Sequence, residues 1–254
     1  MSGPSATIVV AVYRNRETLR ELHRRLCEVL ERERLPFELL FVNDACPGGS
    51  MGVLAELAAA DPRVAVLSLA RNVGQHRAVV AGLAHARGEW AVVMDADLQD
   101  PPEAIPRLLE AGRSGYGAVF AGRRGRYESA GRLATSRLFK WSLHALVGVP
   151  PDAGIFCALR RDVASRLCAI AGPRPFVVAM IGCAGTAMTS VPVERERRRA
   201  GESAYTAWAR AKSGARGIGW ALAWKARTRL GLRPAPPAPV EVAERVGGWL
   251  VSCR

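Results

Sequence analysis

The first half of the chain alternates between short apolar runs and longer amphipathic segments. The apolar runs are rich in β-branched residues, have the length of buried strands, and cover residues 7–12, 37–42, 64–69, 90–94 and 118–121. The segments between them carry apolar residues at helical spacing and cover residues 19–30, 55–60, 75–86 and 106–111. Such alternation is typical of βαβ units, in which right-handed crossovers join parallel strands. The pattern therefore predicts an α/β fold whose parallel strands are joined by helices.

Residues 176–193 form an uncharged stretch in the second half of the chain. The stretch contains glycine, threonine, serine and proline, and it is short for a membrane span. A buried helix that runs into a strand at 189–193 explains it better.

The chain changes character after residue 205. Residues 206–230 contain six Lys or Arg side chains, no acidic residue, and Trp208, Trp220 and Trp224. This composition fits a helix in a membrane interface, and it equally fits a solvated helix whose tryptophans pack on the main domain. We therefore expect a main domain over 1–205, a basic helical segment over 206–230, and a Pro-rich linker with a short amphipathic tail over 231–254.

The overall composition is that of a globular protein with an anionic partner. The chain has 254 residues, of which 49% are hydrophobic, and a net charge of +13. Its six cysteines are scattered without a Cys-X-X-Cys pair, which indicates reduced thiols and a cytoplasmic location. The N-terminus has no pattern of a signal peptide. Charge alone does not choose among a phosphorylated substrate, an anionic lipid and a nucleic acid, but no nucleic-acid-binding motif is present, so we expect no nucleic-acid partner.

The most informative segment follows the apolar run at 90–94. It reads Asp95-Ala-Asp97-Leu-Gln99-Asp100 and ends at two prolines. Because alternate residues of a strand point the same way, Asp95, Asp97 and Gln99 are expected to converge at the carboxyl end of the sheet, where open α/β folds bind ligands. Their oxygen ligands suit Mg²⁺ or Mn²⁺ shared with a substrate phosphate. The alternative is a polar turn that caps a helix at residues 102–103.

Loops after the other strands are expected to line the same crevice. Tyr13 follows the first strand, Asp44 the second, and residues 68–74, with Arg71, the third. An aromatic ring and a carboxylate suit a nucleoside, since the ring packs on the base and the acid accepts from base or ribose donors. No Gly-X-Gly-X-X-Gly or Walker sequence is present, which argues against a dinucleotide or P-loop site.

In combination, three motifs resemble the family 2 glycosyltransferases, in particular the polyprenyl-phosphate sugar synthases related to dolichyl-phosphate mannosyltransferase. They are the segment 93–103, the sequence Arg-Asn-Val-Gly at 71–74 and the sequence Arg-Arg-Ala-Gly-Glu-Ser at 198–203. The resemblance covers roughly residues 6–205. It implies a GT-A fold, which is an α/β fold with a mixed, mostly parallel sheet flanked by helices. It also implies a UDP- or GDP-sugar donor, a divalent metal, inversion at the anomeric carbon and a polyprenyl-phosphate acceptor.

The resemblance also implies roles for individual residues, which are as follows. The donor nucleotide would contact Ala11, Tyr13, Asp44, Arg71, Asp95 and Arg198, the metal would be held by Asp95, Asp97 and Gln99, and the acceptor would face Arg123, Arg137 and Asp152. The acceptor phosphate would be bound by the two arginines. Asp152 would serve as a base or in acceptor positioning. Because a phosphate monoester is already a nucleophile near neutral pH, only a hydroxyl acceptor would need a base.

The chain departs from the family pattern at several positions. Ala11, Arg14 and Asn15 replace proline, asparagine and glutamate in the first-strand motif, Asn43 replaces the first of two aspartates, and Ala204 stands where a lysine or arginine is usual. These changes leave sugar transfer itself in place and weaken the inference about the acceptor. A soluble acceptor, such as a natural-product scaffold or a carrier-bound intermediate, is therefore the alternative to a lipid at a membrane surface. A non-catalytic nucleotide-sugar sensor is a further alternative, whereas a nucleic-acid-binding module is disfavoured because no recognised motif supports it.

Overall fold

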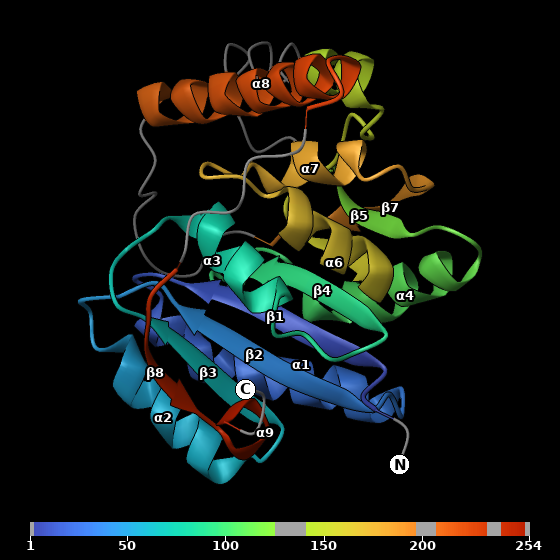
Figure 1. Cartoon of the computed structure of the whole chain (residues 1–254). Coiled ribbons are helices and arrows are strands. Elements are labelled where there is room, and N and C mark those ends of the chain that lie inside the picture. Colours follow the sequence, from blue (N-terminus) through green and yellow to red (C-terminus); the bar gives the residue numbers. More distant parts are fainter. Residues whose placement is uncertain (1–2, 125–140, 197–206, 233–239, 252–254) are drawn as a thin grey trace.

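The computed structural model describes residues 3–124, 141–196, 207–232 and 240–251. Its centre is an eight-stranded mixed sheet in the order β7-β5-β6-β4-β1-β2-β3-β8 (Figure 1). The strands are β1 (Ala6–Val12), β2 (Phe37–Asn43), β3 (Val64–Leu69), β4 (Trp90–Asp95), β5 (Ala118–Arg124), β6 (Cys157–Arg160), β7 (Met188–Glu194) and β8 (Val242–Val246). The α/β fold expected from the sequence is confirmed.

The parallel core of the sheet consists of β4, β1, β2 and β3. β1 pairs in parallel with both β2 and β4, and β2 pairs in parallel with β3. All residues of β2 and β3 are buried, because helices cover both faces of the sheet. A strand buried on both sides reads as a continuous apolar run, which is why these strands are visible in the sequence.

The helices form one layer on each face of the sheet. They are α1 (Leu19–Arg32), α2 (Ser50–Ala60), α3 (Gln75–Leu83), α4 (Ile105–Arg113), α6 (Arg161–Ile170) and α7 (Val177–Cys183), with short 3₁₀ turns η1 (Arg16–Thr18) and η2 (Pro102–Ala104). The apolar faces of α1, α2 and α4 pack with one face of the sheet, and those of α3, α6 and α7 pack with the other. The uncharged stretch at 176–193 becomes α7 and β7, as the sequence predicts.

The second half of the sheet is not parallel throughout. β6 pairs antiparallel with β4 on one side and with β5 on the other, while β7 runs parallel to β5. The carboxyl ends of β5 and β7 therefore emerge at the same edge of the sheet as those of β1 to β4. This arrangement brings chain after residue 194 to the edge that carries Asp95.

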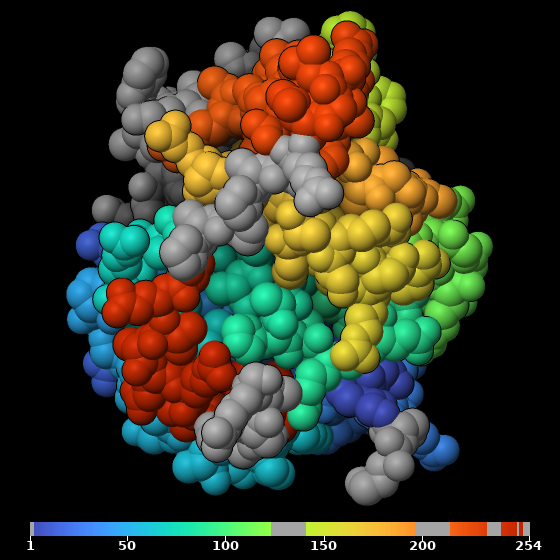
Figure 2. Space-filling view, in the orientation of Figure 1, coloured from blue at the N-terminus to red at the C-terminus, as the bar shows by residue number. Residues whose placement is uncertain are grey.

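The C-terminal part of the chain has two structural roles. α8 (Ala207–Arg229) forms a ridge across one end of the molecule, above α6 and α7 (Figure 2). The tail then returns to the sheet, where β8 pairs antiparallel with β3 and α9 (Gly248–Val251) packs beside it. The sequence pattern did not indicate a strand in this tail. Within the described ranges, no helix combines the length and hydrophobicity that a membrane crossing requires.

The contact of α3 with the sheet gives a test of the packing. A methyl group added at Gly82 of α3 would lie 2.4 Å from Val9 Cγ1 and 2.9 Å from Val42 Cγ2, whereas one added at Gly52 of α2 meets nothing within 4 Å. We predict that Gly82→Ala lowers the free energy of unfolding by about 1–3 kcal/mol through overpacking. Gly52→Ala, the matched control, should raise it by about 0.5–1 kcal/mol through helix propensity. Urea denaturation of both variants measures this, and equal effects would contradict the close packing of α3.

Candidate active site

The carboxyl ends of the parallel strands gather the predicted donor-site residues at one edge of the sheet. Ala11 pairs with Asp95 across β1 and β4 and with Val42 across β1 and β2. The loops that leave β1, β2 and β3 carry Tyr13, Asp44 and Arg71. Tyr13 is half-buried and Arg71 is exposed. The edge is therefore assembled from strands that lie far apart in the sequence.

Asp44 organises the loop after β3. Its two carboxylate oxygens accept hydrogen bonds from the backbone N–H groups of Val73 (2.7 Å) and Gly74 (2.9 Å), and Asn72 Nδ2 donates to its carbonyl oxygen (3.2 Å). Gly74 has a φ of 86°, a conformation that favours glycine. Burial raises the pKa of Asp44, although both amide bonds and Arg77 oppose that shift. Asp44 thus fixes the segment that carries Arg71 and that leads into α3.

The acidic loop at residues 95–100 turns sharply after β4. The strand ends at Asp95, and Leu98 has a φ of 58°. The backbone N–H of Gln99 donates to Asp97 Oδ1 (3.1 Å), and Gln75 Nε2 donates to Asp95 Oδ1. β4 ends at Asp95, so residues 97 and 99 lie in a turn, and the strand alternation expected from the sequence applies only up to Asp95.

The acidic loop is not a helix cap. Neither η2 nor α4, the helices that follow it, receives a hydrogen bond from a capping side chain. Asp97 and Asp100 are buried, which is costly for a carboxylate without a partner. The polar-turn alternative for this segment therefore lacks its defining contact.

Two arginines that the sequence interpretation missed hold the acidic loop and the turn that follows it. Arg195, directly after β7, donates from Nε to Asp100 Oδ1 (2.8 Å), and its Nη2 lies 4.0 Å from Asp95 Oδ2. Burial acts to lower the pKa of Arg195, but the charges of Asp100, Asp95 and Asp97 outweigh it and raise that pKa. Arg25 of α1 binds Glu103 of η2, which follows the acidic loop.

Arg25 is 10% exposed and acts as a clamp. It binds both carboxylate oxygens of Glu103 (3.0 and 2.6 Å) and one oxygen of Glu196 (2.6 Å). Because Glu103 follows the acidic loop and Glu196 follows Arg195, one side chain joins the two segments. No local motif in the sequence marks Arg25, since its partners are 78 and 171 residues away.

The predicted acceptor residues are described only in part. Asp152 lies against β5 and β7, where Ser190 Oγ donates to its Oδ2 (3.1 Å) and where a methyl group on Gly122 would collide with it. Its Oδ1 is buried without a hydrogen-bond partner in the described part of the chain. Arg123 is the second-last residue of β5, near the same edge of the sheet. Arg137 and Arg198 lie outside the described residues.

The chemistry of the donor set fits a hard divalent cation. Asp95 and Asp97 offer carboxylate oxygens and Gln99 an amide oxygen, which are the ligands that Mg²⁺ and Mn²⁺ take. Asp100 adds a buried Oδ2 that makes no hydrogen bond within the described ranges. These residues would hold the metal in a nucleotide complex.

A second cluster with ligand character lies between α1 and α2. One ligand atom each from His23, Cys27 and Asp61 lies within 4.8 Å of the others. However, Arg63 donates to both Asp61 oxygens at 2.9 Å and lies 3.6 Å from Cys27 Sγ. A guanidinium already supplies the positive charge there, so we assign this cluster to the packing of α1 on α2 and β3.

The start of α3 connects α8 to the edge of the sheet that carries Asp95. Gln75, which binds Asp95, is followed by His76, whose ring lies 4.5 Å from that of Phe176 before α7. Phe176 in turn contacts Gly217 of α8 closely enough to exclude a side chain there. Burial, with the charge of Arg216, lowers the pKa of His76 to about 4. His76 is therefore neutral near pH 7. Its ring packs on Phe176, and its Nδ1 accepts a hydrogen bond from the backbone N–H of Val177 (3.4 Å).

Relatives with similar sequences are glycosyltransferases. The chain is 36% identical over 202 residues to the uncharacterised glycosyltransferase YkcC of Bacillus subtilis, covering 78% of this chain and 62% of that protein. It is 35% identical over 204 residues to the undecaprenyl-phosphate 4-deoxy-4-formamido-L-arabinose transferase of Pseudomonas fluorescens, covering 79% and 60%. The chain thus spans less than two thirds of the length of these relatives.

Solved structures share the GT-A fold at low sequence identity. A mannosyltransferase of Pyrobaculum calidifontis, in complex with GDP-mannose and Mn²⁺, matches with a TM-score of 0.62 at 19% identity over 89% of this chain and 65% of that one. The glucosyl-3-phosphoglycerate synthase of Mycobacterium tuberculosis, in complex with Mn²⁺, UDP and phosphoglyceric acid, matches with a TM-score of 0.63 at 16% identity over 91% and 80%.

The family model described as glycosyl transferase family 2 matches residues 7–166. This range includes β1 to β6, the loop of Asp44, the acidic loop and Asp152. Together with the relatives and the GT-A fold, the match shows that the chain belongs to glycosyl transferase family 2.

Proposed function

We propose that the protein is a metal-dependent, inverting glycosyltransferase that moves a sugar from a nucleotide-sugar to a polyprenyl phosphate. The observation that carries the proposal is the acidic loop at residues 95–100, which presents Asp95 and Asp97 at the carboxyl edge of a parallel sheet beside Arg195. A leaving nucleoside diphosphate develops negative charge, which a divalent cation and a guanidinium stabilise. The Pseudomonas relative, which is named as an undecaprenyl-phosphate sugar transferase, supports this choice of acceptor.

The donor nucleotide would lie along the ends of β1 to β4. In this proposal Tyr13 packs on the base, Asp44 accepts from the nucleoside, and Ala11 and Arg71 line the same crevice. Asp44 is already committed to two backbone amides, so its contribution includes holding the loop of Arg71 in place. Asp95 would face the ribose and the diphosphate, with Arg198 near the diphosphate. The nucleotide, UDP or GDP, is left to experiment.

Mg²⁺ or Mn²⁺, held by Asp95, Asp97 and Gln99, would supply Lewis-acid stabilisation of the leaving diphosphate. The chain's own residues then do the remaining work. Gln75 orients Asp95 by a hydrogen bond to Oδ1, and Arg195 and Arg25 hold the loop on either side. Complexes of two structural neighbours with Mn²⁺ and nucleotides support this cofactor class.

The acceptor would approach from the side of β5 and β7. A guanidinium fork binds a phosphate better than it binds a neutral hydroxyl, and Arg123 and Arg137 are proposed for that role. Asp152 keeps one buried oxygen, Oδ1, without a hydrogen-bond partner in the described part of the chain, so it can position an acceptor or take its proton. This oxygen is the specific observation that favours the alternative, a soluble acceptor with a hydroxyl group.

Metal-dependent nucleotide binding tests the donor half of the proposal. Asp97→Asn keeps an oxygen that can accept the Gln99 amide but removes the negative charge, so it should remove the Mn²⁺-dependent part of UDP or GDP affinity and abolish turnover. Isothermal titration with and without Mn²⁺ measures the affinity. Asp162→Asn, an exposed carboxylate on α6, is the matched control and should leave both quantities unchanged. Affinity that does not differ between Mn²⁺ and EDTA in the wild type would contradict the metal site.

Release of nucleoside diphosphate tests the acceptor. Purified protein with UDP- or GDP-sugars should release nucleotide faster when polyprenyl phosphate is added. With this acceptor Asp152→Asn should cost less than about 10-fold in rate, because a phosphate needs no base, whereas a hydroxyl acceptor predicts a loss of about 10²–10⁴-fold. Release that stays at the hydrolysis background for every donor with polyprenyl phosphate would exclude the lipid acceptor.

A lipid acceptor requires contact with a membrane, and α8 has a suitable surface. Gly217, Ala221 and Trp224 of α8 face the body, whereas Leu222 (51% exposed) lies on the outer side and Leu230 (72% exposed) follows the end of the helix. The exposed cations in the described part of α8 are Arg216, Lys225 and Arg229, and α8 contains no acidic residue. Exposed leucines together with cations fit the interface of an anionic bilayer.

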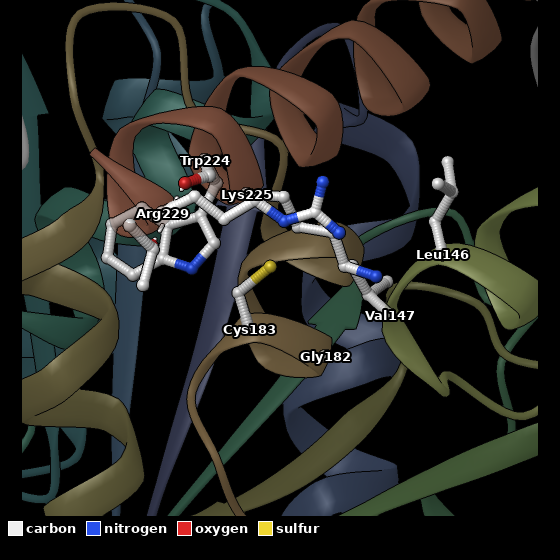
Figure 3. Close-up of a pocket in the computed structure, with 8 residues that line it drawn as sticks. Leu146, Val147, Gly182, Cys183, Trp224, Lys225 and Arg229 are labelled. Carbon is white, nitrogen blue, oxygen red and sulfur yellow. Dashed lines mark hydrogen bonds between the residues drawn. The ribbon is translucent and has the colours of Figure 1, made fainter. Parts of the chain in front are cut away.

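A pocket beneath α8 has the same mixed character. It has a volume of about 350 Å³, and Figure 3 shows Trp224, Lys225 and Arg229 facing Val147 and Cys183 across it. An apolar floor under two cations suits the headgroup end of an anionic lipid. We propose that α8 lies on the membrane surface and so brings the protein to its acceptor.

Liposome sedimentation tests the role of α8. Each cation near an anionic surface contributes about 1 kcal/mol, so the double change Lys225→Gln and Arg229→Gln should weaken binding to acidic liposomes by about 30-fold. Binding of the wild type should also fall as salt is raised. The control is Arg160→Gln with Arg166→Gln, which removes the same charge from an exposed part of the body. Equal losses in both double variants would contradict a specific role of α8.

A further inference from the structure

Arg195 is held in place by two links that do not involve its own side chain. The N–H of the next residue, Glu196, donates to the carbonyl of Gln99 (2.9 Å), so the backbone after β7 is tied to the acidic loop. The Glu196 side chain is held by Arg25, which also binds Glu103 on the far side of the same loop. The loop would therefore stay attached to this segment without the guanidinium of Arg195.

The guanidinium itself is directed at the charges of the donor site. Its Nε donates to Asp100 Oδ1 at 2.8 Å, and its Nη2 lies 4.0 Å from Asp95 Oδ2, beyond hydrogen-bond distance. The Arg195 side chain is 20% exposed and that of Asp100 only 3%. In the described part of the chain, only one of the guanidinium N–H groups of Arg195 thus makes a hydrogen bond. The remaining donors stand beside Asp95, where the proposed function needs a diphosphate.

A cation in this position acts in opposite directions on the two proposed ligands. It repels a divalent cation that approaches Asp95 and Asp97, and it attracts the diphosphate of a nucleotide. A residue that only holds the loop would support both ligands equally, because both need the loop intact. The two roles can therefore be separated by measuring metal and nucleotide binding independently.

We propose that Arg195 is the internal counter-cation of the donor site, which balances Asp95 and Asp100 in the free protein and binds diphosphate oxygens when the nucleotide arrives. This inference rests on the proposed function, since it assumes a nucleotide bound at Asp95. It makes Arg195 a residue that couples the two ligands. Free Mn²⁺ binds weakly while the guanidinium stands beside the carboxylates, and the nucleotide relieves that repulsion by drawing the guanidinium to its own charge.

The test uses Arg195→Gln in the full chain. Binding of Mn²⁺ alone, followed by the electron paramagnetic resonance signal of free Mn²⁺, should become at least ~3-fold tighter. Binding of UDP or GDP in saturating Mn²⁺, followed by calorimetry, should become roughly 10- to 100-fold weaker, as expected for a lost hydrogen bond to a charged group. Arg166→Gln on α6 removes the same charge far from the site and should change neither affinity.

Arg195→Lys separates charge from geometry and serves as the measurement if the glutamine variant does not fold. A lysine keeps the positive charge but loses the planar fork, so Mn²⁺ affinity should stay at the wild-type value while nucleotide affinity falls. Affinities for Mn²⁺ and nucleotide that fall together in either variant, or that both stay unchanged, overturn the inference. If the wild type itself binds neither ligand, the proposed function fails instead.

Discussion

The structure depends first on the parallel pairing of β1 with β2 and β4. The paired strands are covered by helices on both faces, so the ends of the strands are where polar side chains can reach solvent. Because the strands run in the same direction, their carboxyl ends lie at one edge, and Asp95 stands opposite Ala11. A shift of one residue in the register would exchange the two faces of a strand and break both helix layers.

The charge balance at that edge is the second constraint. Asp97 and Asp100 are buried, and a buried carboxylate is tolerated only when it has partners. Arg195 comes from the end of β7 and Arg25 from α1, so the acidic loop acquires its shape only after both halves of the chain have folded. The positive charges that stabilise the buried carboxylates also contribute to the electrostatic field that a metal ion and a diphosphate would meet.

The position of α8 links the donor edge to the outer surface of the molecule. Gln75 contacts Asp95, the next residue His76 packs on Phe176, and Phe176 fills the space opposite Gly217 of α8. These contacts run without a break from α3 through Phe176, which precedes α7, to the backbone of α8. The tail serves a different purpose. Its strand β8 pairs with the edge of β3, whose backbone groups would otherwise lack hydrogen-bond partners in the sheet.

The sequence by itself determined the parallel half of the fold and the residues at its edge. Strands buried on both faces are continuous apolar runs, and side chains such as Asp44 and Asp95 directly follow such runs, so local pattern is sufficient to find them. Arg123, Arg137 and Arg198 came instead from the family resemblance, and their side chains stay predictions. Only the tertiary structure revealed Arg195, Arg25, Gln75 and the strand β8. Their roles arise from contacts between segments up to 171 residues apart, and no periodicity within a segment records which distant charge will neutralise it.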